Sequence, residues 1–278
     1  MDEVRQSVAA TSGHGPEVVF KCEGVSKHFG SLTAVDNFSL EVAAGSVLGI
    51  GGPNGAGKTT FFDVVTGITS ASAGRVWFGG QDISGLSADR ICQLGMARTF
   101  QLNATFEGMS VQENVQVAAC YGHSRSVIPA WKLSAQTQAR VAQALEFVGL
   151  YAKAKHAASS LTVLERKLLM LAGAIATEPR VLFLDEPVGG LAADEIDQIM
   201  ALVKQIQARG VTIVLIEHVM RFLLELSDKV IIMHHGGKLF EGVPQDVAKD
   251  PTVVDTYLGE GTSQRLNQFF EKRQHAKA

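Results

Sequence analysis

Short apolar runs and longer segments with helical periodicity alternate along most of this sequence. Apolar runs with almost no polar position are typical of strands that are buried on both faces of a parallel sheet and joined by crossover helices. They lie at 46–51, 181–184, 211–216 and 229–233. Nearer the N-terminus, segments that begin at 18 and cover 38–42 alternate apolar and polar positions, as half-buried antiparallel strands do. The pattern predicts an α/β fold with a mainly parallel core sheet and an N-terminal antiparallel β subdomain.

The same patterns divide the chain into a main domain and weaker flanking segments. Helical periodicity dominates about 101–178, where strand signals are scarce, so we predict a helical subdomain there, within a main domain at 17–260. Residues 1–16 are polar and are expected to form a flexible extension, and 261–278 form a polar, basic tail. The tail carries apolar residues at helical spacing, which favours a frayed or docked helix: Leu266, Phe269 and Phe270.

A glycine-rich segment joins the first buried run to the start of a predicted helix and satisfies the pattern GxxxxGK[ST]. In such a turn, successive backbone N–H groups and the helix N-terminus face the β and γ phosphates of a bound triphosphate. Lys58 adds a positive charge, and the Thr59 hydroxyl is a ligand for Mg²⁺. A glycine-rich turn without a ligand is the alternative, but the strand-to-helix context favours a phosphate site. The ATP-binding residues predicted here are Gly52, Pro53, Asn54, Gly55, Ala56, Gly57, Lys58, Thr59 and Thr60.

A second element of this chemistry ends the apolar run 181–184, where two carboxylates, Asp185 and Glu186, follow directly. In P-loop ATPases an aspartate at this strand end holds the Mg²⁺ shell, which is the role expected of Asp185. Glu186 is then placed to act as general base on the water that attacks the γ phosphate. An acidic pair after a strand is by itself often a helix cap or a solvated pair. Downstream of a P-loop, it is the expected second half of the site.

The order of these motifs over roughly 20–260 resembles the ATPase domain of ABC transporters. The order is Phe29, GPNGAGKTT, Gln101, LTVLE, VLFLDEP and His218. Within that superfamily, four further segments resemble the branched-chain amino acid class of importers: ARTFQ at 97–101, ENV at 113–115, IEH at 216–218 and TYLG at 256–259.

The resemblance implies roles for three residues that no single-residue argument would select. Phe29 would stack on adenine, which is a flat apolar surface. Gln101 would offer its amide oxygen to Mg²⁺ or to the attacking water, and would couple the nucleotide state to rotation of the helical subdomain. His218 would contact the γ phosphate and hold Glu186 in place. Plain packing or a surface position is the alternative for each residue alone, and their joint occurrence favours the functional interpretation.

The loop that resembles the family signature departs from the usual Leu-Ser-Gly-Gly-Gln, which docks on the γ phosphate of the opposite subunit. The matching residues are Leu161, Thr162, Val163, Leu164 and Glu165. If Thr162 caps the following helix, backbone N–H groups and the helix dipole still favour the phosphate, by about 0.3–1 kcal/mol. The Glu165 carboxylate is unfavourable near a triphosphate, although it suits a first helical turn. Gly173 stands where the family usually has arginine, and Ala192 where it has Asp or Asn.

These departures motivate a hypothesis about partners. We expect a second ATPase subunit, in a homodimer or, as the favoured case, a heterodimer in which the second subunit's own signature loop serves this P-loop. The resemblance also implies two membrane permease subunits and, indirectly, an extracytoplasmic substrate-binding protein. One permease helix would enter a groove beside Gln101, against Leu102, Phe106 and Met109, or these residues are ordinary subdomain core. The transported molecule would be a branched-chain or related amino acid, with amides, urea and aromatic acids left open.

Composition limits the cellular locations and the kinds of partner that we expect for this chain. A formal net charge of -3 over 278 residues creates no strong field, so we expect no nucleic-acid partner. The three cysteines, Cys22, Cys92 and Cys120, are too few and too widely spaced for a disulfide framework or a CxxC metal site. The polar start lacks a signal peptide's apolar stretch, and no run reaches the roughly 18 apolar residues of a spanning helix. We therefore expect a location on the cytoplasmic face of the inner (plasma) membrane, peripheral through the permease.

Two other functions remain open at this stage. A soluble, non-transport ABC ATPase that acts on DNA or ribosomes usually has two ATPase domains in one chain, a long coiled coil or a basic surface, none of which is visible here. A nucleotide-sensing subunit with weak catalysis is favoured by the altered signature loop and disfavoured by the intact Glu186 and His218.

Overall fold

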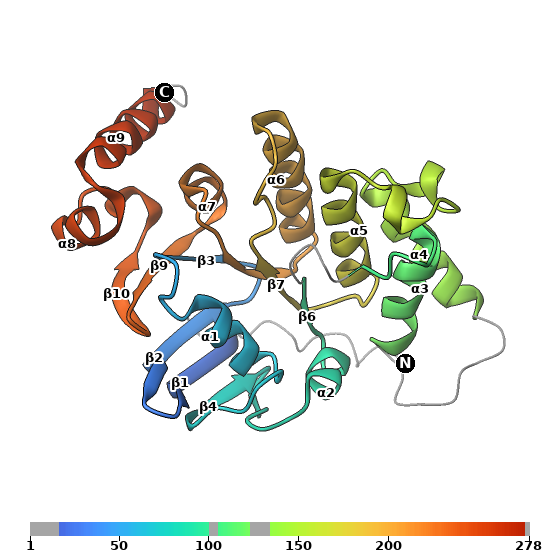
Figure 1. The fold of residues 1–278 in the computed structure, drawn as a ribbon, viewed down its shortest axis with the longest axis horizontal. Coiled ribbons are helices and arrows are strands. Elements are labelled where there is room, and N and C mark those ends of the chain that lie inside the picture. The colour runs from blue at the N-terminus through green and yellow to red at the C-terminus, as the bar shows by residue number, and fades with distance from the viewer. Residues whose placement is uncertain (1–16, 100–104, 123–133, 276–278) are drawn as a thin grey trace, which may run out of the picture.

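The structure is a computed structural model that describes residues 17–99, 105–122 and 134–275. A six-stranded sheet with the order β10-β9-β3-β8-β7-β6 runs through its centre (Figure 1). Its strands are β3 (Val47–Gly51), β6 (Met96–Arg98), β7 (Val181–Asp185), β8 (Thr212–Ile216), β9 (Lys229–His234) and β10 (Gly237–Gly242). All neighbours pair in parallel except β9 and β10, which form a hairpin. The predicted mainly parallel core sheet is confirmed.

A second sheet, with the order β2-β1-β4-β5, is antiparallel throughout. It contains β1 (Val18–Phe29), β2 (Leu32–Ala43), β4 (Ala73–Phe78) and β5 (Gln81–Asp82). The predicted N-terminal β subdomain is therefore confirmed. The sequence pattern did not predict β4, β5, β6 or β10, which are short or have exposed positions that interrupt the apolar pattern.

Most of the helices lie beside the central sheet (Figure 1). The helices are α1 (Lys58–Val65), α2 (Ala88–Gln93), α3 (Val111–Tyr121), α4 (Ala135–Phe147), α5 (Val163–Ile175), α6 (Ala193–Ala208), α7 (Met220–Leu226), α8 (Pro251–Val253) and α9 (Glu260–His275). Short 3-10 turns are η2 (Tyr151–Lys153), η3 (Ala158–Ser160) and η4 (Pro244–Asp246), and η5 (Val254–Leu258) is a π-helical turn. In Figure 1, α3, α4 and α5 lie together at one end of the molecule, and α6 and α7 cover one face of the central sheet.

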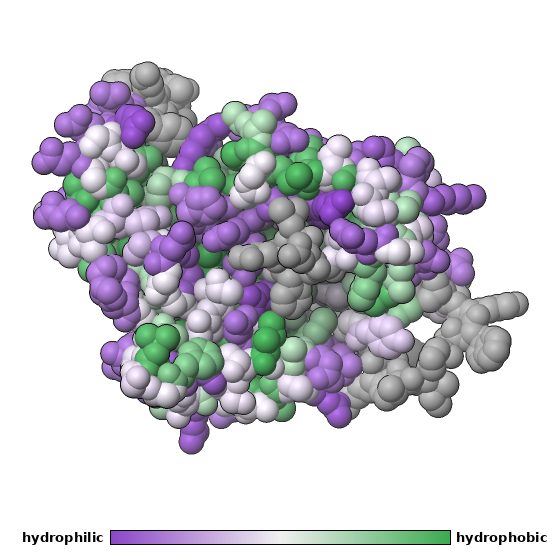
Figure 2. Space-filling view, in the orientation of Figure 1, coloured by the Kyte–Doolittle hydropathy of each residue, from purple (hydrophilic) through white to green (hydrophobic). Residues whose placement is uncertain are grey.

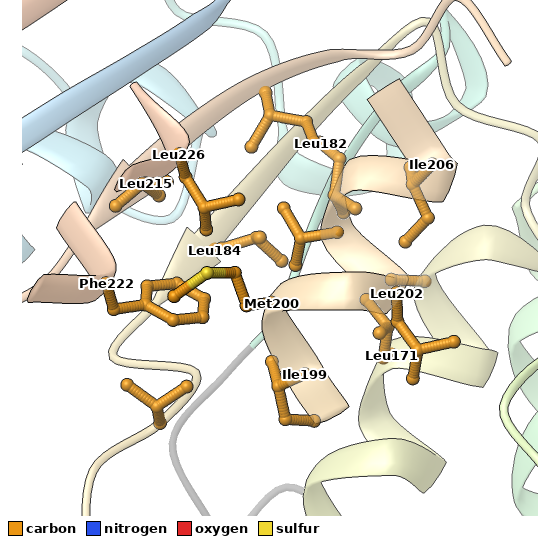
Figure 3. Packing of buried hydrophobic residues seen from close by; sticks show 14 of the residues in the cluster. Leu171, Leu182, Leu184, Ile199, Met200, Leu202, Ile206, Leu215, Phe222 and Leu226 are labelled. Atoms are coloured by element: carbon orange, nitrogen blue, oxygen red, sulfur yellow. The ribbon is translucent and has the colours of Figure 1, made fainter. Parts of the chain in front are cut away.

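The central strands are buried on both faces, as their uninterrupted apolar runs predict. Alternate residues of β7 and β8 enter two different cores. Leu182 and Leu215 pack under α6 and α7, in the core shown in Figure 3. Phe183 faces the opposite core, between the sheet and α1, where its ring meets that of Phe62 edge-on with the centroids 5.0 Å apart. Burial on both faces leaves the carboxyl ends of β3, β7 and β8 as the places where polar residues can gather.

The C-terminal helix α9 is docked against the rest of the chain, which is one of the two outcomes expected of the tail. Leu266 is buried and Phe270 packs against the same core as α7. The Ser263 hydroxyl donates a hydrogen bond to the carbonyl of Ala248 (2.7 Å). Hydrophilic side chains dominate the surface over α8 and α9 in Figure 2, and the hydrophobic residues on the visible face form small separate patches. Within the described segments, the helices are too short or too polar to cross a membrane.

Candidate active site

The loop between β3 and α1 has a backbone that only glycine fits at two positions. Gly52 and Gly57 have φ values of 141° and 97°. A Cβ on Gly52 would lie 2.2 Å from the carbonyl oxygen of Met233, and one on Gly57 would lie 2.1 Å from that of Ala34. The loop therefore fits tightly against β9 and β2. Helix α1 begins directly after it, with no side-chain cap and no acidic residue in its first turn. Its first N–H groups thus remain available to an anion.

The Lys58 side chain lies over this loop. Its ammonium donates hydrogen bonds to the carbonyls of Gly52 (2.7 Å) and Pro53 (2.9 Å), and the residue is buried. Burial lowers the pKa of Lys58, while the charges of Glu186 and Asp185 act to raise it. The P-loop lysine and the two carboxylates are thus close enough to influence one another. Thr59 is exposed at the start of α1.

Asp185 ends β7 and is 3% exposed. Its Oδ2 accepts a hydrogen bond from Nη2 of Arg98 (2.7 Å), and Nη1 of the same arginine contacts Oδ1 of Asp63 (2.6 Å). The other carboxylate oxygen, Oδ1, is buried and has no hydrogen-bond partner within the described part of the chain. Burial raises the pKa of Asp185, and the Arg98 guanidinium opposes that shift. The site thus contains one buried oxygen whose hydrogen-bonding capacity is unused.

Glu186 adopts a backbone conformation that is unusual for a residue with a Cβ, with a φ of 48°. Such left-handed residues cost about 1–3 kcal/mol and persist where neighbouring groups hold them. Here the Glu186 N–H donates to the carbonyl of Ile216 (3.0 Å), and its carbonyl accepts from the ammonium of Lys167 (2.9 Å). The turn separates the side chains of Asp185, which is buried, and Glu186, which is 30% exposed.

The loop after β8 brings His218 to the same place. Its Nδ1 lies 3.9 Å from Oε1 of Glu186 and 3.7 Å from Oε2 of Glu217. Both distances exceed a direct hydrogen bond, so His218 is near Glu186 without being bonded to it. Glu217 itself is fully buried, and its carboxylate accepts hydrogen bonds from the N–H groups of Val188 (3.0 Å), His218 (2.9 Å) and Val219 (2.9 Å).

Two other residues were predicted for the nucleotide site, Phe29 and Gln101. Phe29 ends β1 and is 52% exposed, with the ammonium of Lys27 4.9 Å from its ring centre. An exposed aromatic ring is available for stacking, and the adenine role stays a prediction. Gln101 and the neighbouring Leu102 lie outside the described residues.

The altered signature loop meets the condition stated for Thr162, because this residue caps α5 in a capping box. The Thr162 hydroxyl accepts from the N–H of Glu165 (3.2 Å), and the Glu165 carboxylate accepts from the N–H of Thr162 (3.0 Å). The same carboxylate pairs with the ammonium of Lys153 (2.5 Å), and this contact lowers the pKa of Glu165. Val163 is 45% exposed at the helix start. The negative charge of Glu165 is thus partly balanced within the chain.

The two other departures, Gly173 and Ala192, have different structural consequences. Gly173 lies on α5 beside a cavity of about 410 Å³, where a Cβ would lie 3.7 Å from the methyl group of Ala118, an ordinary van der Waals distance. Ala192 precedes α6 without a side-chain oxygen to cap it, and its N–H instead donates to the Glu195 carboxylate (2.8 Å).

The chain is similar to known proteins. The sequence model that describes the ABC transporter family matches residues 35–189, which is more than half of the chain. The chain belongs to the ABC transporter family. The high-affinity branched-chain amino acid transport ATP-binding protein BraF of Pseudomonas aeruginosa is 34% identical to this ABC protein over 250 residues, which cover 87% of this chain and 98% of BraF. The protein of the same description in Escherichia coli, LivG, is 34% identical over 246 residues, covering 85% and 96% of the two chains.

Solved structures agree with this assignment. The ADP conformation of an ATP-binding cassette of an ABC transporter superposes on this ABC ATPase with a TM-score of 0.80 and 31% identity. The match covers 88% of this chain and 100% of the other one. The protein is therefore an ATPase that uses ATP and Mg²⁺.

The described residues of this ABC ATPase fit a magnesium-bound triphosphate. The glycine-only cradle and the uncapped start of α1 supply backbone donors. The unpartnered Oδ1 of Asp185 is a carboxylate oxygen, which is the kind of ligand that Mg²⁺ prefers. Asp185 therefore has one oxygen for a metal shell while the other stays with Arg98.

Three residues of this site were missed by sequence reasoning as individual contributors: Arg98, Lys167 and Glu217. Arg98 and Glu217 each follow apolar strand residues, which is a signal that could have selected them. Lys167 gives no such signal, because a lysine on a helix is normally solvated, whereas here it is 6% exposed.

Proposed function

We propose that this chain is the ATP-hydrolysing motor subunit of an importer for branched-chain or related amino acids. Two ATPase subunits close on ATP and thereby move two membrane permease subunits, which receive the substrate from an extracytoplasmic binding protein. BraF and LivG are similar to this chain over nearly their whole lengths, and their names, which specify branched-chain amino acid transport, support this substrate class. The subunit works on the cytoplasmic face of the inner membrane and is held there through the permeases.

The observation that carries the proposal is the convergence of the P-loop with Asp185, Glu186 and His218 at one edge of the central sheet. The strands β3, β8 and β7 are adjacent and parallel, so the residues that follow them meet at their carboxyl ends. The charges of both carboxylates influence the pKa of Lys58 across this edge. Four groups with complementary chemistry thus surround the place where the helix α1 N-terminus points.

Each residue has a distinct role in this proposal. The loop Gly52–Gly57 and Lys58 bind the β and γ phosphates, and Thr60 continues the same helix start. Thr59, Asp185 and Gln101 hold Mg²⁺, which when bound neutralises charge on the phosphates. Oε1 or Oε2 of Glu186 accepts a proton from the attacking water as it approaches the γ phosphate in line. His218 contacts that phosphate and limits the movement of Glu186. Phe29 stacks on adenine.

The signature loop supports a heterodimer. In the capping box, the Thr162 N–H and the Glu165 carboxylate satisfy one another, and Glu165 leaves a carboxylate near the place where a partner's γ phosphate would dock. The loop therefore offers fewer free N–H donors and more negative charge to an ATP in the opposite subunit than a glycine-rich loop does. A second ATPase subunit with its own signature loop serves the P-loop of this chain.

The permease contact is proposed for the cavity of about 410 Å³ between α2, α3 and α5. Exposed apolar side chains border it, as helix-in-groove contacts require: Ile68, Phe106 and Tyr121. Arg98 also lines the cavity while binding Asp185, so one residue connects the groove with the metal site. In this proposal, residues 17–260 form the ATPase domain, about 101–178 form its helical subdomain, and 1–16 and 261–278 are flanking segments.

Phosphate release by the full chain, alone and coexpressed with a candidate partner ATPase and permeases, tests the proposal. Saturating Mg·ATP should give turnover that rises at least about tenfold with the partner, and Glu186→Gln should remove it without loss of ATP binding. Lys58→Ala should weaken Mg·ATP binding in calorimetry and stop uptake of labelled leucine into vesicles. Efficient turnover by the chain alone would count against the heterodimer. Turnover that survives Glu186→Gln would refute the assigned chemistry.

A further inference from the structure

Glu217 is a fully buried carboxylate directly behind the P-loop. Its own N–H donates to the carbonyl of Ile50 (3.3 Å), which lies on the strand that leads into the loop. Its residue exposure is 0%, which is rare for an acidic side chain outside an ion pair or a functional site. Burial raises the pKa of Glu217, and the backbone N–H groups that donate hydrogen bonds to its carboxylate oppose this shift.

The carboxylate adds a second connection between the loops that follow the paired strands β7 and β8, beyond the hydrogen bond from the Glu186 N–H to the carbonyl of Ile216 (3.0 Å). Oε1 accepts the N–H of Val188, which belongs to the loop that begins with Glu186 and leads to α6. Oε2 accepts the N–H groups of His218 and Val219, in the loop between β8 and α7. All three donors lie within 2.9–3.0 Å of the carboxylate. Because an ionised carboxylate only accepts, it suits three converging N–H donors better than any neutral side chain of that size.

Charged groups on the neighbouring elements fit the same arrangement. Lys167 of α5 is buried nearby. Burial lowers the pKa of its ammonium, and the charges of Glu217 and Glu186 oppose that shift, so the groups attract each other. His218, on the other side, has its Nδ1 3.7 Å from Oε2 of Glu217. Tyr257 is another titratable neighbour among the described residues: burial raises its pKa, and the negative charge of Glu217 acts in the same direction.

The position of the two loops decides the separation of the two catalytic side chains. The ring of His218 would lie 3.8 Å from a Cβ on Gly189, the residue that follows Val188. His218 and Glu186 are 3.9 Å apart and have no direct hydrogen bond to fix that distance. A link behind them, from one loop to the other, can fix it.

We propose that Glu217 is a positioning residue, whose carboxylate holds the His218 loop and the Glu186 loop at the separation that hydrolysis requires. The inference rests on the proposed roles of Glu186 and His218. Because its side chain is fully buried, Glu217 acts through the backbone N–H groups that donate to it.

Two substitutions separate this role from simple packing. Glu217→Gln keeps the volume of the side chain but replaces one carboxylate oxygen, an acceptor, with an NH₂ group, a donor. That group would face a backbone N–H, which is also a donor, so the hydrogen bond to one of the two loops is lost. Glu217→Asp keeps the charge and can still accept from the N–H two residues ahead, but it is too short by one methylene to reach Val188 as well. Because small displacements of catalytic groups cost on the order of 10²-fold, both variants should lower kcat about 10- to 100-fold. KM and the Kd for Mg·ATP should stay within about twofold, because the P-loop is unchanged.

A double-mutant cycle with His218→Ala provides the readout that a structural role would not move. The assay is phosphate release by the full chain, in the assembly in which the wild-type chain turns over. If Glu217 acts through His218, Glu217→Gln should add less than about twofold to the loss caused by His218→Ala. Losses that multiply, or that follow a parallel fall in the melting temperature and in nucleotide affinity, would overturn the inference.

The controls distinguish failure of the inference from failure of the proposed function. Glu113→Gln changes another capping carboxylate, on α3, which accepts from the N–H of the N-cap residue Ser110 (2.7 Å), and it should leave kcat unchanged. If Glu186→Gln abolishes hydrolysis and His218→Ala lowers it strongly to a measurable residual rate, while both Glu217 variants retain full hydrolysis, the inference alone is wrong. If His218→Ala itself leaves hydrolysis intact, the proposed roles are wrong and the inference falls with them.

Discussion

Lys167→Met should reduce hydrolysis sharply while leaving the fold intact. Lys167 is 6% exposed, and its ammonium donates to the carbonyl of Glu186 (2.9 Å). A hydrogen bond from a charged donor contributes about 1.5–3 kcal/mol. The left-handed conformation of Glu186 costs a similar amount, about 1–3 kcal/mol. Without the lysine, the backbone at Glu186 is free to relax from its φ of 48°, which turns the side chain away from its place near His218.

The expected size of the effect follows from these values. If the relaxed conformation is favoured by about 1.4–2.7 kcal/mol, the catalytic conformation is depleted about 10- to 100-fold, and kcat falls by that factor. Stability should change much less, because methionine also removes a buried charge whose desolvation lowers the pKa of Lys167. We expect the unfolding free energy to change by no more than about 1 kcal/mol, or roughly 2–4 °C in melting temperature.

Steady-state phosphate release, calorimetric binding of Mg·ATP and thermal unfolding should be measured on the same preparations. Lys204→Met is the matched control, because Lys204 is an exposed lysine on α6 and should tolerate the change. An unchanged kcat in Lys167→Met would refute the reasoning. So would a fall in kcat accompanied by a melting-temperature loss well above about 4 °C, since the lysine would then act on the fold.

Two further predictions concern the metal carboxylate and the signature loop. Asp185→Asn should abolish the additional thermal stabilisation that Mg²⁺ gives in the presence of ATP, because the oxygen available to the metal loses its charge; thermal shift with and without Mg²⁺ measures this. Glu165→Gln should keep the Thr162 cap, since glutamine also completes a capping box, and should raise the turnover of the chain assayed alone. Contact with Lys153 lowers the pKa of Glu165, so its stabilising effect is present above the ordinary value of 4.5 and is lost as pH falls through the lowered value. When the free energy of unfolding is measured as a function of acidic pH, the pH-dependent contribution from Glu165, about 0.3–1 kcal/mol, should be missing in the Glu165→Gln variant.

The parts of the fold that the sequence predicts best are those in which one local signal is sufficient. Strands such as β7 and β8 are apolar at every position except the Asp185 end and Thr212, and they are buried on both faces. The P-loop is equally local, because its glycines follow a strand and precede a helix. Short strands such as β6 could not be predicted, since three residues carry no periodicity and Met96–Arg98 becomes a strand only by pairing with β7.

The residues of the candidate site also fall into those with a local sequence signal and those without one. Asp185, Glu186 and Lys58 belong to contiguous motifs, and the sequence places them. The contacts of Arg98 and Glu217 depend on residues far away in the chain: Arg98 binds Asp185, and Glu217 binds Val188. Their chemistry becomes visible only when parallel strands bring those segments together. The pairing of Glu165 with Lys153 is similar, because the two lie 12 residues apart on different elements.

The position of Arg98 has a thermodynamic consequence for coupling between the nucleotide and the permease. Its guanidinium is divided between Asp63 and Asp185, and the same residue lines the proposed permease groove. A metal that draws Asp185 toward itself and a helix that fills the groove therefore act on one buried group. Coupling between two binding sites is reciprocal, so a permease that binds the Mg·ATP form about tenfold more tightly must raise the affinity for Mg·ATP about tenfold. If the coupling passes through Asp185, ATP without metal should show no such increase, and an equal increase in both titrations would place the coupling elsewhere.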